Sequence, residues 1–204
     1  IRAAAAAGPD AIVVPKVNSA EQVKKLVDSL EKAGAPDKTT LWAMVETPVA
    51  MLHCEEIATA SERLSVLVMG TNDLAKELYA EHVPGRAPLL TGLSLCLLAA
   101  RATGKSIVDG VYNNVKDAEG FLAECVQGRQ FGFDGKTLIH PGQVEPCNEA
   151  FAPSTQAVED ARGMIAAFEE AIARGDGVVT YNGRMIENLH VDTARRTLAI
   201  ADAI

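Results

Sequence analysis

Short apolar runs, rich in β-branched residues, alternate along the chain with stretches of helical periodicity. Five such runs are present: "AIVVPKV" (11–17), "LWAMVE" (41–46), "LSVLVMG" (64–70), "KSIVDGVY" (105–112) and "GKTLIHP" (135–141). Nearly continuous apolar runs are typical of parallel strands that are buried on both faces. The pattern therefore predicts an α/β fold in which helices cover a parallel sheet.

The stretches between these runs carry helix signals. Ser19 to Gln22 has the form of a capping box, and an apolar stripe of helical spacing follows it at Val23, Leu26, Val27 and Leu30. Further helices are expected near 49–60, 90–103 and 117–127. Each predicted helix connects two predicted strands, as parallel pairing requires.

The strand–helix alternation ends after residue 141. The proline-rich stretch "PGQVEPCNEAFAPS" leads to a helix that begins at Ser154 or Thr155 and ends at Gly175. "DGVVTYNGRMIEN" predicts a turn or hairpin around Asn182-Gly183, and "LHVDTARRTLAIADAI" predicts a last helix. We therefore expect a strand–helix domain over 1–148 and a helical extension over 149–204 that covers this domain or contacts a neighbouring subunit.

The number of strands leaves two ways to complete the sheet. An open doubly wound sheet needs about five strands, whereas a (β/α)₈ barrel needs eight and typically ~250 residues. Five predicted strands favour the open sheet on counting alone, and three more units before Ile1 would complete a barrel. Because "RAAAAAG" resembles the end of a helix that stops at Gly8, we expect these residues to be part of a longer protein.

Composition and charge narrow the classes of function. The 204 residues are 48% hydrophobic and 23% charged, which is ordinary for a soluble globular protein. A net charge of -8 argues against a nucleic-acid partner, and no apolar run approaches the ~20 residues of a membrane span. The four cysteines show no C-x-x-C spacing, so we expect buried, reduced thiols in a cytoplasmic protein: Cys54, Cys96, Cys125 and Cys147.

Carboxylates follow two of the predicted strands. Glu46 ends the second run, and Asp73 comes three residues after the third run. Neighbouring parallel strands end at the same rim, so the two side chains are expected to converge. Two carboxylates without His or Cys partners suit a hard cation such as Mg²⁺. The alternative is that each carboxylate is a helix N-cap or a member of a surface ion pair.

The residues before Asp73 are candidates for contacts with a substrate. Gly70 leaves room for a close approach to the backbone, and Thr71 and Asn72 add polar groups and N–H donors that we expect to be exposed. The alternative is an Asx-type cap, in which Asn72 or Asp73 starts the next helix.

Two other apparent motifs lead to no site. "GRQFGFDGKT" lacks the first glycine of a P-loop because Gln130 takes its place, and the Lys136-Thr137 pair enters a strand. Lys136 is then expected to be a surface lysine or an anion contact. His140 could reach the rim, but a hydrogen-bonded structural histidine is the favoured interpretation, because the histidines lack metal-ligand spacing.

Several segments together resemble the citrate lyase β-subunit-like proteins of the HpcH/HpaI aldolase group, which includes malyl-CoA lyases and malyl-CoA thioesterases. They are "PKVNSAEQV", "LWAMVETPVAML", "LSVLVMGTNDLAKEL", "GKTLIHPGQV" and "NGRMIENLHVDTARRTL", and the resemblance extends over essentially all 204 residues. It implies a (β/α)₈ TIM barrel with a C-terminal helical extension, of which this chain lacks the first three strands. It also implies a cytoplasmic homo-oligomer, a trimer or hexamer.

The resemblance assigns roles to individual residues. It implies that Glu46 and Asp73 bind Mg²⁺, and that the segment from Gly70 to Asp73 lies beside the carbonyl substrate. Glu187, in "NGRMIEN", stands where relatives carry an aspartate that acts as acid/base in a neighbouring subunit's active site. Relatives also carry a substrate-binding arginine on an upstream strand, and Arg2 does not match it.

The activity that the resemblance implies is Mg²⁺-dependent lyase or thioesterase chemistry. The substrates would be malyl-CoA- or citramalyl-CoA-like 3-hydroxyacyl-CoA esters, cleaved through an enolate, with acyl-CoA thioesters and 2-oxo acids as partners. Two alternatives remain open. One is a CoA-independent 2-oxo acid aldolase of the same group, and the other is a non-catalytic subunit that keeps the fold.

Overall fold

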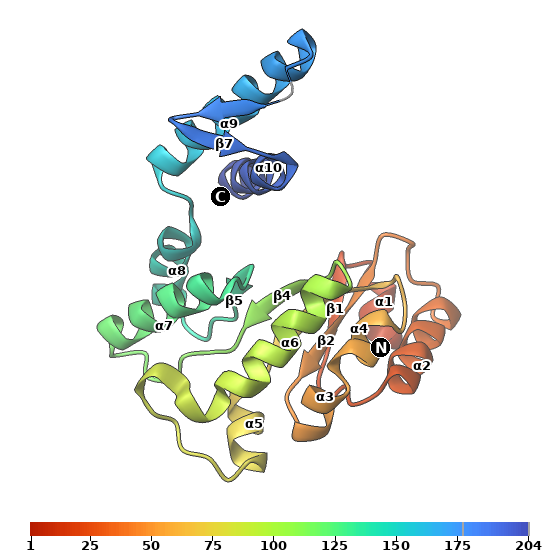
Figure 1. Ribbon diagram of the computed structural model, residues 1–204. Coiled ribbons are helices and arrows are strands. Elements are labelled where there is room, and N and C mark those ends of the chain that lie inside the picture. The colour runs from red at the N-terminus through yellow and green to blue at the C-terminus, as the bar shows by residue number, and fades with distance from the viewer. Residues whose placement is uncertain (177, 204) are drawn as a thin grey trace. The chain divides into compact units, whose positions relative to one another are not determined.

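The computed structural model describes residues 1–176 and 178–203. These form two compact units, Ile1–Ala150 and Phe151–Ile204, and each is described by itself (Figure 1). Gly177, in the predicted turn segment, and Ile204, at the end of the predicted last helix, lie outside the described residues.

The five apolar runs form one parallel sheet in the first unit, with the strands in chain order. The strands are β1 (Ala11–Val14), β2 (Thr40–Val45), β3 (Leu64–Met69), β4 (Ser106–Asp109) and β5 (Gly135–Lys136). The predicted parallel sheet is thus confirmed. The fifth strand is much shorter than its apolar run, which leads to Pro141 at the start of the 3₁₀ turn η2 (Pro141–Gln143). Proline has no N–H group for a strand ladder.

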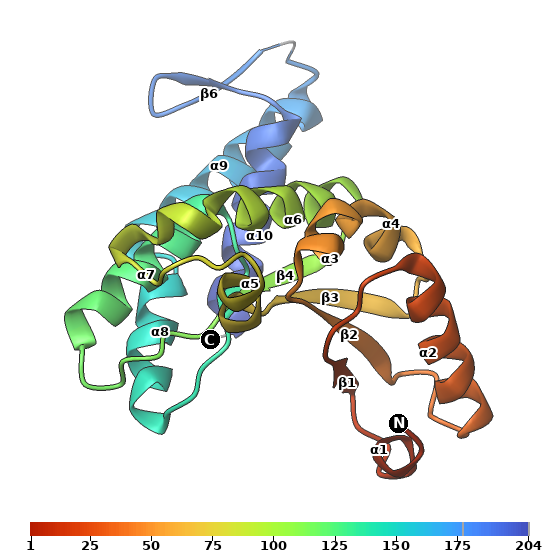
Figure 2. The same ribbon diagram turned by 90° about the horizontal axis from the view of Figure 1, so that it is seen from below.

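Helices lie on the outer side of the sheet. Figure 2 shows the strands along an arc, with α2 (Ala20–Lys32), α4 (Cys54–Thr59), α6 (Leu90–Ala102) and α7 (Ala118–Phe131) outside it. Along β2, Leu41, Ala43 and Val45 are fully buried, and the residues between them are half-buried. The central strand β3 is buried along almost its whole length, as its continuous apolar run predicts.

The helix ends follow the predicted signals with two differences. The Ser19 hydroxyl accepts a hydrogen bond from Gln22 N at 3.2 Å, but the Gln22 side chain accepts from Asn18 N, one residue before the expected Ser19 N. The helix predicted over 49–60 is divided at His53 into α3 (Pro48–Leu52) and α4. As predicted, α1 (Arg2–Ala6) ends just before Gly8, whose φ is +63°.

Three short elements complete the first unit. They are α5 (Thr71–Glu77) after β3, the 3₁₀ segment η1 (Pro84–Leu89) before α6, and, after η2, α8 (Val144–Phe151), whose last residue already belongs to the second unit. The four cysteines are free and buried, as predicted. Among the residues described, no helix is both long and apolar enough to cross a membrane.

The second unit consists of two helices and a hairpin. These are α9 (Thr155–Arg174), β6 (Val179–Tyr181), β7 (Arg184–Ile186) and α10 (Asn188–Ala203). Ser154 caps α9 and Gly175 ends it, as predicted. Asn182 and Gly183 both have positive φ, which the predicted two-residue hairpin turn requires. The core of this unit contains Ala171, Val179, Ile186 and Val191.

Candidate active site

Glu46 lies at the carboxyl end of β2 and is almost completely buried, with 3% of its surface exposed. Its Oε1 accepts a hydrogen bond from the backbone N–H of Lys16 at 2.8 Å. The N-cap of α3 is the next residue, Thr47, whose hydroxyl accepts from Ala50 N. Glu46 is therefore not a helix cap. Burial raises the pKa of Glu46, and the nearby negative charge of Asp73 raises it further. The hydrogen bond from the Lys16 N–H opposes this increase.

Asp73 lies in the first turn of α5 but makes no capping hydrogen bond there, and Gly70 occupies the N-cap position. The Asx-cap alternative is therefore wrong. Its Oδ1 lies 3.0 Å from Nζ of Lys16, and the Asp73 side chain is 38% exposed. This hydrogen bond and the charge of Asp73 raise the pKa of Lys16. The ion-pair alternative is thus observed for Asp73, and its partner is the residue that also binds Glu46.

Lys16 connects the two carboxylates. It belongs to the loop after β1, donates its N–H to Glu46, and extends its ammonium group to Asp73. These three residues follow β1, β2 and β3, which are neighbours in the sheet. Glu46 and Asp73 therefore come together at the carboxyl-end rim of the sheet. Lys16 was not among the residues expected at the site, although it lies in the first apolar run, two residues after β1 ends.

Gly70 is required by the packing of Glu46. A Cβ atom at this position would lie 2.3 Å from Cβ of Glu46 and 2.5 Å from its Oε2. The space that we expected to serve a substrate is thus occupied by the Glu46 side chain.

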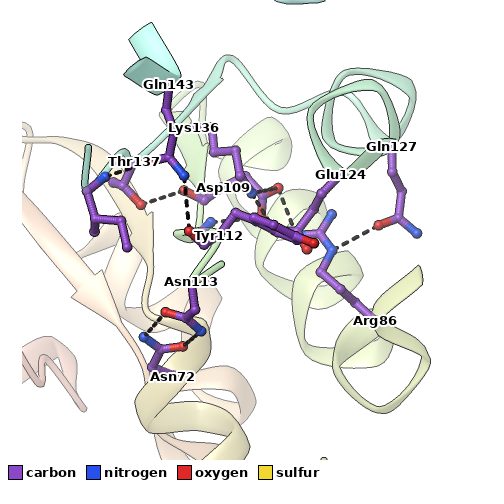
Figure 3. A network of polar contacts seen from close by, with 12 residues as sticks. Asn72, Arg86, Asp109, Tyr112, Asn113, Glu124, Gln127, Lys136, Thr137 and Gln143 are labelled. Carbon is purple, nitrogen blue, oxygen red and sulfur yellow. Dashed lines mark hydrogen bonds and ion pairs between the residues drawn. The ribbon is translucent and has the colours of Figure 1, made fainter. Parts of the chain in front are cut away.

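Thr71 and Asn72 differ from each other in exposure. Thr71 is buried with its side chain against Gly110, so the expectation of an exposed polar group there is wrong. Asn72 is exposed and exchanges two amide hydrogen bonds, of 2.9 and 2.7 Å, with Asn113 in the loop between β4 and α7 (Figure 3). This pair links α5 to that loop at the rim.

A second polar cluster is centred on Asp109, at the end of β4 (Figure 3). The Asp109 carboxylate is fully buried and accepts hydrogen bonds from Arg86 Nη1, at 2.7 and 2.8 Å, and from Lys136 Nζ, at 3.1 Å. Lys136 also contacts Glu124 Oε1 at 2.6 Å. The two cations and two carboxylates compensate each other. Lys136 is therefore a buried lysine that pairs with two carboxylates of this chain, and the expectation of a surface lysine is wrong.

A cavity of about 400 Å³ lies beside this cluster. The loop before α6, the β4–α7 loop and α7 line it, with Arg86, Tyr112, Asn113, Glu124 and Gln127 among its residues. The Tyr112 hydroxyl donates to Asp117 Oδ2 at 2.6 Å, which raises the pKa of Tyr112 to about 12. The volume of the cavity suits a small molecule. Asn113 belongs both to the cavity wall and to the pair with Asn72.

Two further candidates lie elsewhere. Glu187 belongs to the second unit, directly after β7, where its carboxylate is exposed and its N–H donates to His190 Nδ1 at 3.0 Å. His140 Nδ1 accepts from Gly142 N at 3.0 Å and so caps the η2 turn. This is the local structural role that we favoured for His140.

The Glu46–Asp73 pair fits a magnesium ion. No group of three or more His, Cys, Asp or Glu side chains that could hold a metal occurs in the described part of the chain. Mg²⁺ instead takes one or two carboxylates and keeps several waters. The Lys16 ammonium already places a positive charge against Asp73, as a bound cation would.

Comparison with known families agrees with this arrangement of strands and helices. The family described as HpcH/HpaI aldolase/citrate lyase matches residues 1–141. A second family, described as a C–C bond lyase of the TIM-barrel fold, matches residues 89–203. These matches confirm the predicted TIM-barrel-type fold.

Individual relatives cover the whole chain. It is 54% identical over 204 residues to a (3S)-malyl-CoA thioesterase of Cereibacter sphaeroides, covering 100% of this chain and 69% of the relative. It is 36% identical over 208 residues to the citrate lyase subunit beta of Leuconostoc mesenteroides subsp. cremoris, with the same coverage of both.

One solved structure of similar fold contains a metal ion and coenzyme A. It is the protein CitE from Mycobacterium tuberculosis in complex with magnesium, acetoacetate and coenzyme A. The TM-score is 0.71 at 28% identity, over 95% of this chain and 68% of that protein. The two sequence relatives are enzymes by name, as the resemblance implied. This chain belongs to the HpcH/HpaI aldolase/citrate lyase family.

Proposed function

We propose that this chain acts as a Mg²⁺-dependent lyase or thioester hydrolase on malyl-CoA- or citramalyl-CoA-like 3-hydroxyacyl-CoA esters. The observation that carries this proposal is the meeting of Glu46 and Asp73 at Lys16, on the rim of the parallel sheet. The malyl-CoA thioesterase, at 54% identity, supports the choice of substrate. The CitE complex supports magnesium and a CoA ligand.

Glu46 and Asp73 would hold the metal ion. Burial keeps the Glu46 side chain in one place, against Gly70 and the Lys16 N–H, so its carboxylate is preorganised. Asp73 is more exposed and lies on the solvent side of the pair. A bound Mg²⁺ would supply Lewis-acid polarisation of a carbonyl and a template for the carboxylate of a 2-oxo acid.

The segment from Gly70 to Asn72 would position the substrate in three different ways. Gly70 allows Glu46 to pack closely, and Thr71 fixes the start of α5 against Gly110. Asn72 is the exposed member, and its amide is held in one orientation by Asn113. It is therefore the residue of the three that we propose to contact the substrate directly.

Glu187 would transfer the proton. Cleavage between Cα and Cβ of a 3-hydroxyacyl thioester leaves an enolate that must be protonated, and a positioned carboxyl group can do this. Glu187 is exposed after a hairpin of the second unit. We propose that its carboxylate enters the active site of a neighbouring subunit in a cytoplasmic homo-oligomer, a trimer or hexamer. With water as nucleophile, the same pocket would hydrolyse the thioester.

The proposal is tested with Asp73→Ala and Asp73→Asn, with Asp28→Asn as the matched control. Asp28 is also part of an exposed ion pair, with Lys32 at 2.6 Å on α2. We expect the Asp73 variants to lose metal-dependent turnover of malyl-CoA by at least about 100-fold, because metal polarisation contributes several kcal/mol. Asp28→Asn should behave like the wild type.

Full activity of Asp73→Ala would refute the assignment. Two other results would replace the proposed function by an alternative. Turnover of free 2-oxo acids without turnover of CoA thioesters would indicate the aldolase. Binding of Mg²⁺ and a CoA ester without any product by mass spectrometry would indicate the non-catalytic subunit.

A further inference from the structure

Lys16 has an unusual backbone conformation. Its φ is +52°, in the left-handed region that non-glycine residues seldom adopt. In this conformation its N–H donates to Oε1 of Glu46 at 2.8 Å. A strained residue at a functional site is retained when the conformation serves that site. Here it presents both the N–H and the side chain of one residue to the two carboxylates.

The ammonium group of Lys16 crosses from one strand end to another. Lys16 follows β1, and its partner Asp73 lies on α5, after β3. β2 lies between these strands, and Glu46 directly follows it. By contrast, Lys25 and Lys32 pair with carboxylates one helical turn away on their own helix. The pair with Asp73 instead connects two different elements, the loop after β1 and α5.

We propose that Lys16 is a positioning residue whose ammonium occupies Asp73 until the metal ion displaces it. This rests on the proposed function, because Asp73 is there a metal ligand. Two cations beside one carboxylate repel each other, so a bound Mg²⁺ weakens the contact between Asp73 and the ammonium group. The displaced ammonium then lies at the rim without its carboxylate, and pairs with the carboxylate of the incoming 2-oxo acid. Lys16 thereby makes anion binding depend on prior metal binding.

The exposure of the Lys16 and Asp73 side chains sets how strongly Lys16 affects Mg²⁺ affinity. The side chains of Lys16 and Asp73 are 54% and 38% exposed, so their ion pair is weak and easily exchanged. Removal of the ammonium should therefore tighten Mg²⁺ binding by roughly two- to fivefold at low salt. The gain should shrink as salt is added, because salt screens exposed charges.

The first measurement is calorimetric titration of MgCl₂ into the full chain and its variants. Lys16→Met and Lys16→Gly both remove the ammonium, while glycine also relieves the positive φ and retains the N–H to Glu46. We expect both to bind Mg²⁺ roughly two- to fivefold more tightly than wild type. Lys16→Arg keeps the charge and should bind as wild type does, as should the control Lys25→Met, whose ion pair lies on α2.

The second measurement is titration of pyruvate, as the 2-oxo acid probe, at saturating MgCl₂. We expect Lys16→Met to bind pyruvate at least about fivefold more weakly than wild type, and Lys16→Arg to restore most of the loss. A merely structural role for Lys16 would not tighten the metal and weaken the anion in the same variant.

The outcomes distinguish a failure of the proposed function from a failure of the proposed role of Lys16. If wild type binds no Mg²⁺, the proposed function fails. If wild type binds Mg²⁺ and Lys16→Met binds it no more tightly, or binds pyruvate equally well, the role of Lys16 is overturned while the proposed function stands. Tighter Mg²⁺ binding by Lys16→Met that is absent in Lys16→Gly would also overturn the role of Lys16, because both variants lack the ammonium group.

Discussion

The buried charge cluster around Asp109 allows a quantitative prediction for Lys136→Met. Lys136 Nζ lies 3.1 Å from Asp109 Oδ2 and 2.6 Å from Glu124 Oε1, and its side chain is fully buried. Methionine keeps the apolar stem but removes the charge. Arg86 then faces two carboxylates alone, and one negative charge is left uncompensated.

The loss of one partner of a buried ion pair costs about 3–5 kcal/mol. In a chain of this size, each kcal/mol lowers the unfolding midpoint by about 2–4 °C. We therefore expect the free energy of unfolding of Lys136→Met to fall by about 3–5 kcal/mol, and its thermal midpoint by about 6–20 °C. Urea unfolding and calorimetry measure the two quantities.

Lys38→Met is the matched control. Lys38 lies 2.7 Å from Asp10, but the two side chains are 63% and 91% exposed, so its loss should cost less than about 1 kcal/mol. The double variant Lys136→Met/Glu124→Gln restores the balance of charge and should recover part of the loss. A Lys136→Met protein within about 1 kcal/mol of wild type would refute the charge-balance argument.

Other predictions concern the rim and the cavity. Gly70→Ala places Cβ 2.3 Å from Glu46 Cβ, so it should destabilise the fold by about 1–3 kcal/mol and weaken Mg²⁺ binding, whereas Gly135→Ala, with its nearest neighbour at 3.8 Å, should leave metal binding unchanged. Ultraviolet titration should find one tyrosine ionising at about 12, absent in Tyr112→Phe. The Tyr112 hydroxyl lowers the pKa of Asp117, so this carboxylate stabilises the fold above its unfolded pKa of about 4. That contribution is lost as pH falls through the lower folded pKa, and the stability difference between wild type and Asp117→Asn should disappear in acid.

Much of the fold could be predicted from local patterns. Continuous apolar runs fixed the positions of all five strands, and the Ser154 cap and Asn182-Gly183 turn were correct because short-range hydrogen bonds and backbone angles decide them. The extent of the fifth strand was overestimated because pairing ends at Lys136, before the apolar run does. The helix expected over 49–60 is divided at His53, and no residue pattern considered above predicts this division.

The candidate site was less predictable than the strands. Glu46 and Asp73 could be selected because each follows a strand, but Lys16 depends on a positive φ that the sequence does not reveal. Lys136 was misassigned because its burial depends on Asp109 and Glu124, which come from β4 and α7. Asp109 also ends an apolar strand, and the rule that selected Glu46 would have found it.

Turnover of malyl-CoA with Mg²⁺ and with a chelator tests the central claim most directly. Wild type should release free CoA with malate, or acetyl-CoA with glyoxylate, only when Mg²⁺ is present, and mass spectrometry separates these products. Glu46→Gln should release neither, because it removes the charge of one proposed metal ligand without changing its size. Equal product formation with Mg²⁺ and with the chelator, or by Glu46→Gln, would contradict the account.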